Sequence, residues 1–256
     1  DLLAEHGYQT LNRMQDLSSV DTILAIQDTT SIDLTSKNIG NKLGHLENIA
    51  AKGYFYHPTM LLTTDNQVLG MVQNNIWTRD PKAVILPAKE KRERNRQRPI
   101  EEKESMRWIS SYKEVDSIAK QYPQKCFVSI GDRESDIFDL IMEACQENSV
   151  AKIIIRSSHD RKTLEDDNQM KLLWEQLLES KVKITYNTSI PATHKREARE
   201  SIVEVRYKKV NIIPPQIFKD KRTIEINVVC VTEKNDKVPE NDKLNWMLLT
   251  TLPIDT

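Results

Sequence analysis

The sequence predicts a mixed α/β protein with an additional β-rich block, and three observations predict it. Short apolar runs that suit buried strands alternate with segments of helical periodicity in the first part of the chain. Residues 53–64 and 67–79 are aromatic and β-branched, and the Asp65-Asn66 turn signal between them predicts a hairpin. Beyond residue 180, apolar and polar residues alternate with period two, which is typical of antiparallel strands with one solvated face.

The other elements of the first part follow from apolar spacing. Helical segments recur with apolar residues three and four positions apart, and strands are short runs such as "TILAIQ" and "CFVSIG". Pro123 ends one helix, and Ser135 is the expected cap of the next. The predicted order is helix, strand, helix, strand, helix, strand and helix, at residues 2–16, 22–30, 108–122, 126–131, 135–144, 151–158 and 163–180.

The β-rich block is predicted from alternation. Its expected strands are residues 183–190, 201–210 and 223–231, and residues 244–254 form a further apolar run. Strand, hairpin, helix, strand, helix and strand followed by such a block indicate a mixed sheet with an inserted β region, because a regular βαβα alternation is absent.

Composition narrows the class of protein. Of the 256 residues, 38% are hydrophobic and 29% charged, and the net charge of −1 gives no overall attraction to nucleic acid. Three widely separated cysteines argue against a disulfide framework or a structural zinc site. No apolar run is long enough for a membrane span and no signal peptide is evident, so we expect a cytoplasmic protein with no membrane partner.

Carboxylates follow two of the predicted buried strands. Asp28 comes after "LAIQ" and Asp132 after "VSIG". If these strands are parallel neighbours, both side chains emerge at one end of the sheet, where they could share Mg²⁺ or Mn²⁺. Two such ions can activate a water or hydroxyl at a phosphodiester. Alternatively, each aspartate caps a turn. Arg133 and Glu134 either brace the same turn as an ion pair or take part in catalysis.

Several charged and aromatic residues allow more than one role. The run Lys89–Arg98 holds six positive and two negative charges, which suits either a phosphate-contacting arm or a solvated loop. Asp136 and Asp139 are expected in the first turn of a helix, where negative charge favours the dipole. Trp77, Trp108 and Trp174 are expected in the core, and His57 either in the core or at the surface.

Four sequence blocks carry a family resemblance. "LAIQDTTSI", "VSIGDRESDIFDL", "IIIRSSHDRK" and "NWMLLTTLPI" occur in this order over nearly the whole chain. Together they resemble the DDE-type cut-and-paste transposases of the insertion-sequence-four group, and the Asp-Arg-Glu-x-Asp-Ile block is specific.

The resemblance implies an RNase H-like mixed sheet flanked by helices, with an antiparallel β-rich insertion after the second aspartate. The implied organisation is an N-terminal helical remnant at residues 1–20, the first part of the catalytic core at 21–160, the insertion at 161–243 and a return strand at 244–256. The implied activity is metal-dependent DNA cleavage and strand transfer at transposon ends, in a synapsed homodimer bound to double-stranded DNA in the bacterial nucleoid.

The resemblance also assigns residues. Asp28 and Asp132 would be the first two catalytic carboxylates and would bind Mg²⁺ or Mn²⁺. Arg161 would lie beside the DNA, and Trp246 would stack on a flipped base next to the cleavage site. In the insertion, which resembles the DNA-facing part of the family, the expected DNA-binding residues are Lys195, Arg196 and Arg199.

One departure from the family pattern concerns the third acid. The family carries it in a Tyr-x2-Arg-x3-Glu-x6-Lys signature after the tryptophan strand, and the printed sequence ends at Thr256. Glu233 and Glu240 are expected in a polar loop and are not substitutes. We therefore expect either a fragment of a transposase core that is inactive alone, or a truncated remnant that inhibits a full-length transposase by binding DNA or poisoning its dimer.

Overall fold

The computed structural model describes residues 2–36, 43–79, 85–165, 169–193, 196–218 and 222–254. The chain divides into two compact units, residues 1–130 and 131–256, and each is described by itself. The domain limits expected at residues 20, 160 and 243 stay predictions.

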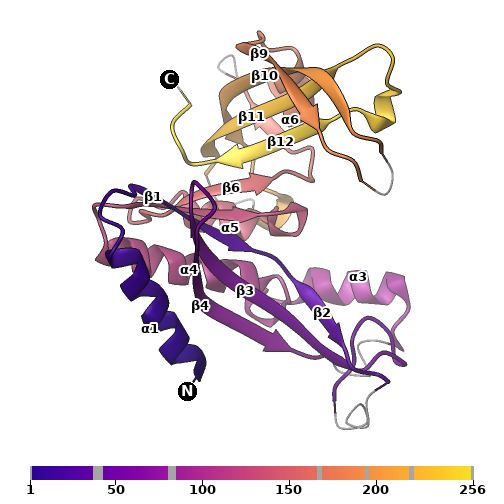
Figure 1. The fold of residues 1–256 in the computed structure, drawn as a ribbon. Helices are drawn as coiled ribbons and strands as arrows, with labels where there is room; N and C mark the ends of the chain where they lie inside the picture. Colours follow the sequence, from indigo (N-terminus) through magenta and orange to yellow (C-terminus); the bar gives the residue numbers. More distant parts are fainter. Residues whose placement is uncertain are drawn as a thin grey trace. The chain divides into compact units, whose positions relative to one another are not determined.

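The first unit is built around a long hairpin (Figure 1). Strand β3 (Gly53–Thr63) pairs antiparallel with β4 (Val68–Trp77), which confirms the predicted hairpin. Its other edge pairs antiparallel with β1 (Thr22–Gln27) and β2 (Thr30–Asp33). Strand β1 in turn pairs in parallel with β5 (Cys126–Gly131). The unit therefore contains the mixed sheet that the sequence predicts.

Strands β1 and β2 follow each other along the same edge of β3 and are separated only by Asp28 and Thr29. Gln27 pairs with Thr59 and Thr30 with Tyr56, so the same register continues on both sides of the break. Continuing that register places Asp28 opposite Pro58 of β3. Because proline has no backbone N–H, it cannot donate a ladder hydrogen bond at this position. The strand therefore opens next to the predicted catalytic carboxylate.

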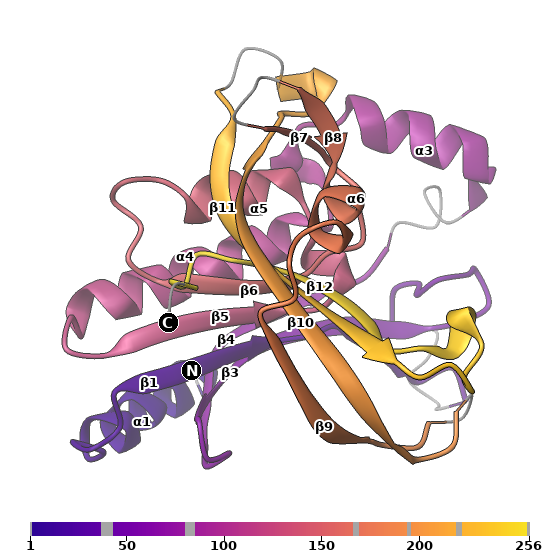
Figure 2. The same ribbon diagram turned by 90° about the horizontal axis from the view of Figure 1, so that it is seen from above.

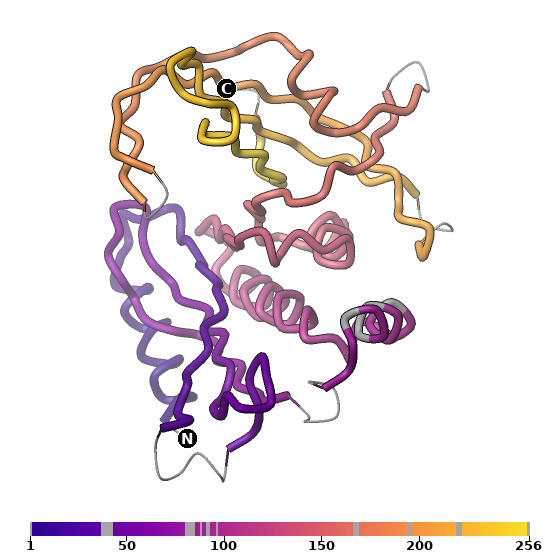
Figure 3. The backbone as a smooth tube through the Cα atoms, turned by 90° about the vertical axis from the view of Figure 1, so that its right-hand side faces the viewer, coloured from indigo at the N-terminus to yellow at the C-terminus, as the bar shows by residue number. Residues whose placement is uncertain are grey.

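Helices cover this unit as the apolar spacing predicts. Helix α1 (Leu2–Gln15) packs against β4, and α4 (Met106–Gln121) packs against β4 and β1. Figure 3 shows the two helices on different sides of the strands. The buried apolar side chains of α4 are Trp108, Ile109, Tyr112, Val115, Ile118 and Ala119. The charged run forms a helix, α3 (Ala88–Gln97), followed by the short turn η2 (Ile100–Glu102). The expectation of a loop there was wrong.

The second unit is dominated by antiparallel strands. Its strand order is β6-β12-β11-β10-β7-β8, and β9 pairs with β10. The strands are β6 (Lys152–Arg156), β7 (Lys162–Leu164), β8 (Met170–Leu172), β9 (Ile184–Ile190), β10 (Arg199–Ile212), β11 (Ile224–Lys234) and β12 (Asn245–Thr250). Figure 2 shows β10 and β11 as long twisted strands. The short turns η4 (Gln216–Phe218) and η5 (Glu240–Asp242) lie in the connections. The β-rich block is thus confirmed.

Two helix predictions in this unit were wrong in extent. Residues 163–180 contain β7 and β8 before a short helix, α6 (Leu173–Leu178). Leu173 and Leu177 are buried, whereas Trp174 is 38% exposed and is not a core residue. Near the start of the unit, Ser135 lies in the turn η3 (Arg133–Ser135), so it does not cap α5 (Phe138–Ala144). Within the described residues, no helix has the length and apolarity to cross a bilayer.

Two glycines test the packing of α1 on β4. Gly70 has φ of +138°, and a Cβ there would lie 2.2 Å from Oγ1 of Thr10 on α1, whereas a Cβ at Gly7 within α1 would meet its nearest atoms at 3.9 Å. We expect Gly70→Ala to lower the free energy of unfolding by about 1–3 kcal/mol. Gly7→Ala should raise it by about 0.5–1 kcal/mol. Urea unfolding measures both, and equal effects of the two substitutions would contradict the described packing.

Candidate functional site

The two predicted catalytic aspartates, Asp28 and Asp132, directly follow β1 and β5 respectively. The parallel register of these strands includes Ala25 with Ser129 and ends with Ile26 opposite Ile130, two residues before Asp28 and Asp132 respectively. A buried hydrogen bond of 2.7 Å from Nε2 of Gln27 to Oγ of Ser129 joins the two strands. Because a one-residue slip would turn every side chain to the other face, this buried polar pair helps to specify the register.

Asp28 is exposed, and its neighbour Thr29 is held by contacts within the first unit. The Thr29 backbone N–H donates to Oδ1 of Asp28 at 2.7 Å. The Thr29 hydroxyl accepts a 2.9 Å hydrogen bond from Nε of Arg107 and lies 2.9 Å from Nδ1 of His57. These contacts hold Thr29 next to the Asp28 carboxylate.

His57 is fully buried and is neutral at pH 7. Burial and the positive charge of Arg107 lower the pKa of His57 to about 4. A hydrogen bond with the Asp28 backbone acts in the opposite direction and raises this pKa. The ring also packs edge-on against Trp108, with centroids 4.5 Å apart. Trp108 is buried, as expected for the core.

Arg107 belongs to a row of aromatic rings and arginine side chains in mutual contact, which we call the cation–aromatic stack. The Arg107 guanidinium lies 5.1 Å from the Trp77 ring and 5.8 Å from the Trp108 ring. Trp77 stacks on Phe55 at 5.3 Å, and Arg79 lies 4.4 Å from the Phe55 ring. The members in order are Arg79, Phe55, Trp77, Arg107, Trp108 and His57. This stack fixes the arginine that holds Thr29.

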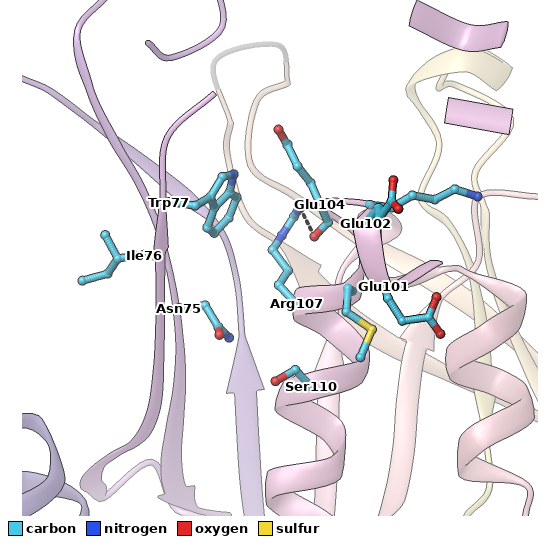
Figure 4. A pocket seen from close by; sticks show the side chains of 10 residues that line it. Asn75, Ile76, Trp77, Glu101, Glu102, Glu104, Arg107 and Ser110 are labelled. Carbon is cyan, nitrogen blue, oxygen red and sulfur yellow. Dashed lines mark hydrogen bonds between the residues drawn. The ribbon is translucent and has the colours of Figure 1, made fainter. Parts of the chain in front are cut away.

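An open cleft of about 390 Å³ borders the stack (Figure 4). Trp77 and Arg107 face each other across it, while Glu101, Glu102 and Glu104 lie along the η2 side. Arg107 also donates to the Glu104 carbonyl at 2.8 Å. Lys103 and Arg107 also line the cleft and Glu104 pairs with Arg79, so the charges are mixed and give no strong attraction for a phosphate backbone.

Asp132 begins the turn η3 in the second unit. Its Oδ1 accepts a 2.9 Å hydrogen bond from the Glu134 backbone N–H, and its carbonyl accepts from Oγ of Ser135 at 2.6 Å. Asp132 thus caps a turn, as the simpler interpretation expects, and its side chain is exposed. Arg133 makes no ion pair with a described residue, and the roles of Arg133 and Glu134 in bracing the turn or in catalysis stay predictions.

Arg161 lies in a buried ion pair with Asp136. The side chains are 9% and 0% exposed, and Nη1 of Arg161 lies 2.7 Å from Oδ1 of Asp136. Backbone N–H groups of Ser158 and His159 also donate to this carboxylate, at 2.6 and 2.9 Å. Asp136 precedes α5, whereas Asp139 lies in its first turn as predicted. DNA contact by Arg161 stays a prediction. In the structure its guanidinium neutralises the buried Asp136 carboxylate.

Trp246 on β12 is the aromatic residue expected to stack on a flipped base. It is 42% exposed, and the Arg156 guanidinium at the end of β6 lies 5.5 Å from its ring. Strands β6 and β12 are antiparallel with Arg156 opposite Leu248, so Trp246 is the diagonal neighbour on the same face. Sequence reasoning missed Arg156, because an arginine that ends an apolar strand gives no local signal of its partner.

Arg199 is paired with Glu233. Nε and Nη2 of Arg199 donate to the two carboxylate oxygens at 2.7 Å each. Glu233 is buried within β11, so its expected place in a polar loop was wrong. Arg196 is half-buried, and Lys195 lies outside the described residues. DNA contact by these three residues stays a prediction.

The donor atoms at the two aspartates suit Mg²⁺ or Mn²⁺. Asp28 and Asp132 are exposed carboxylates, each with one oxygen bound to a backbone N–H and the other without a donor from the described residues. Carboxylate oxygen is the ligand that these ions prefer. Among the described residues, three His, Cys, Asp or Glu side chains do not come together as a metal site.

Comparisons with known proteins give a distant structural likeness. No protein-family model and no curated protein matches the chain. A cryo-EM structure of the piggyBac transposase synaptic complex with hairpin DNA is similar to it with a TM-score of 0.39 and 10% sequence identity. The match covers 99% of this chain and 40% of that one, so the chain spans less than half the length of that transposase.

The buried ion pair of Arg161 predicts a loss of stability. We expect Arg161→Gln to lower the free energy of unfolding by about 3 kcal/mol, because Asp136 would be left buried without its cation. Arg133→Gln removes an exposed arginine from the same region and should change this free energy by less than about 0.5 kcal/mol. Chemical unfolding compares the two variants. Similar small effects would show that Arg161 is not needed for the fold.

The Arg199–Glu233 pair predicts a pH dependence of stability. Hydrogen bonding from Arg199 lowers the pKa of Glu233 from its usual 4.5 to about 2. A carboxylate whose pKa is lower in the folded state stabilises it fully above pH 4.5, and this contribution is lost as pH falls toward 2. Glu233→Gln should therefore flatten the acid limb of the unfolding free energy. Glu225→Gln, which alters an exposed pair with Lys209, should leave that limb unchanged. Identical profiles for both variants would refute the assignment.

Proposed function

We propose that this chain is part of the catalytic core of a DDE-type DNA transposase. In this proposal Asp28 and Asp132 are two catalytic carboxylates that together bind Mg²⁺ or Mn²⁺ and act on double-stranded DNA. The observation that carries it is the parallel register of β1 with β5. The last paired residues, Ile26 and Ile130, each lie two residues before an aspartate, so the segments that follow the two strands leave the sheet at the same end. The four sequence blocks that resemble the insertion-sequence-four group support the same assignment.

The residues around Asp28 have a defined part in the proposal. A bound divalent ion would polarise a phosphodiester oxygen and lower the pKa of a bound water. Thr29 holds the Asp28 carboxylate through its backbone N–H, and Arg107 holds the Thr29 hydroxyl. His57 is neutral and buried, so it adds no positive charge next to the carboxylate. The protein thus presents the Asp28 carboxyl group in a fixed orientation, which favours cation binding.

The residues around Asp132 complete the proposal. The turn η3 holds the Asp132 carboxylate through the Glu134 N–H, and Trp246 offers a partly exposed ring in the same unit. An indole face can stack on an extruded base and thereby offset part of the unstacking energy. In this scheme Arg161 and Arg199 keep structural roles, and Lys195 and Arg196 remain proposed phosphate contacts.

Titration with Mn²⁺ tests the proposed metal site. We expect weak binding by the wild-type chain, and a loss of affinity of about tenfold or more for Asp28→Asn and for Asp132→Asn. Electron paramagnetic resonance of free Mn²⁺ measures the bound fraction. Asp21→Asn is the matched control, since it removes a carboxylate just before the opposite end of β1. Unchanged binding in Asp132→Asn, or an equal loss in Asp21→Asn, would count against the proposal.

A further inference from the structure

Arg156 is a half-buried cation that forms no ion pair or hydrogen bond with a described residue, although the nearby Asp132 attracts it. Its guanidinium lies 5.5 Å from the centre of the Trp246 ring, which it contacts by a cation–π interaction. Other arginines of this unit are neutralised: Arg161 by Asp136, Arg199 by Glu233 and Arg206 by Glu204. A buried or half-buried guanidinium usually has an acceptor, so the missing partner is informative.

Arg133 is a second unpaired cation in the same region. Turn η3, which contains it, packs against β6, and Oγ of Ser158 donates to the Arg133 carbonyl at 3.2 Å. Arg133 is exposed and makes no ion pair with a described residue. Burial lowers the pKa of Arg156, repulsion from Arg133 lowers it further, and attraction to Asp132 raises it. Two cations that repel each other next to Asp132 would both gain from an anion between them.

We propose that Arg133 and Arg156 form a phosphate-binding subsite next to Asp132, which takes a backbone phosphate of DNA. The planar guanidinium suits bidentate contact with phosphate oxygens. Trp246 holds Arg156 by a cation–π contact and so positions it. This inference rests on the proposed function, because that function supplies DNA as the source of the phosphate.

The salt dependence of DNA binding tests the subsite. Each phosphate contact that is lost reduces the slope of log affinity against log salt by about 0.9 for duplex DNA. We expect Arg156→Gln and Arg133→Gln each to weaken binding of a fluorescein-labelled duplex about tenfold at low salt and to make the slope shallower by about one. Fluorescence anisotropy over a salt series with the whole 256-residue chain measures both quantities.

Matched variants separate a phosphate contact from a structural role. Arg156→Lys keeps the charge and should keep most of the slope. Lys152→Gln removes a cation from the other end of β6, on the same face, and should leave the slope unchanged. If Arg156→Gln does not fold, Arg133→Gln carries the same test, since Arg133 is exposed.

Three results would contradict the subsite. They are unchanged slopes in the arginine variants, an equal change of slope in Lys152→Gln, and no duplex binding by the wild-type chain. Inorganic phosphate is the second probe. If the arginine substitutions weaken binding of inorganic phosphate but not of the duplex, the arginines bind a free anion and the DNA contact is refuted. The Mn²⁺ titration is a separate measurement, so failure of the metal site and failure of this subsite are distinguishable.

Discussion

The parallel pairing of β1 with β5 is the constraint on which the proposed site depends. The chain leaves both strands in the same direction, and each strand is followed within two residues by an aspartate. The buried hydrogen bond between Gln27 and Ser129 helps to keep the strands in register. A slip by one residue would exchange the buried and exposed faces of β1 and turn the Asp28 side chain away. The local position of each carboxylate thus follows from strand pairing.

Asp28 depends on a second constraint, the break in the strand opposite Pro58. Without a backbone N–H at residue 58, the ladder cannot close there, and Asp28 and Thr29 are released from regular pairing. Side-chain contacts from other elements then hold Asp28 and Thr29 in place of the missing strand-pairing hydrogen bonds. Arg107, held between Trp77 and Trp108, donates to the Thr29 hydroxyl. The cation–aromatic stack therefore gives a locally irregular segment a fixed conformation, which is how a functional loop is made rigid.

Local patterns in the sequence were sufficient for much of the fold. The apolar runs before Asp28 and Asp132, the Asp65-Asn66 hairpin and the alternation in β10 and β11 depend on neighbouring residues, and these elements are confirmed. The charged run at Lys89–Arg98 forms a helix because helix-favouring residues outweigh the missing apolar face. Strands β7 and β8 pair with each other where a helix was predicted, because β7 also pairs with β10 far along the chain.

The site was less predictable because its contacts join distant residues. Neither the pairing of Arg161 with Asp136 nor that of Arg199 with Glu233 has a local signal, so both arginines were expected to face DNA. The position of Arg156 on the Trp246 ring requires the register of β6 and β12. Family resemblance can assign the aspartates, but only packing shows which arginines already have carboxylate partners.

Anomalous X-ray diffraction from crystals grown with Mn²⁺ would test the central claim most directly. The account predicts an ion that is bound by one oxygen from Asp28 and one from Asp132, each about 2.1 Å away. An ion bound to only one of these aspartates, or carboxylates too far apart to share it, would contradict the account.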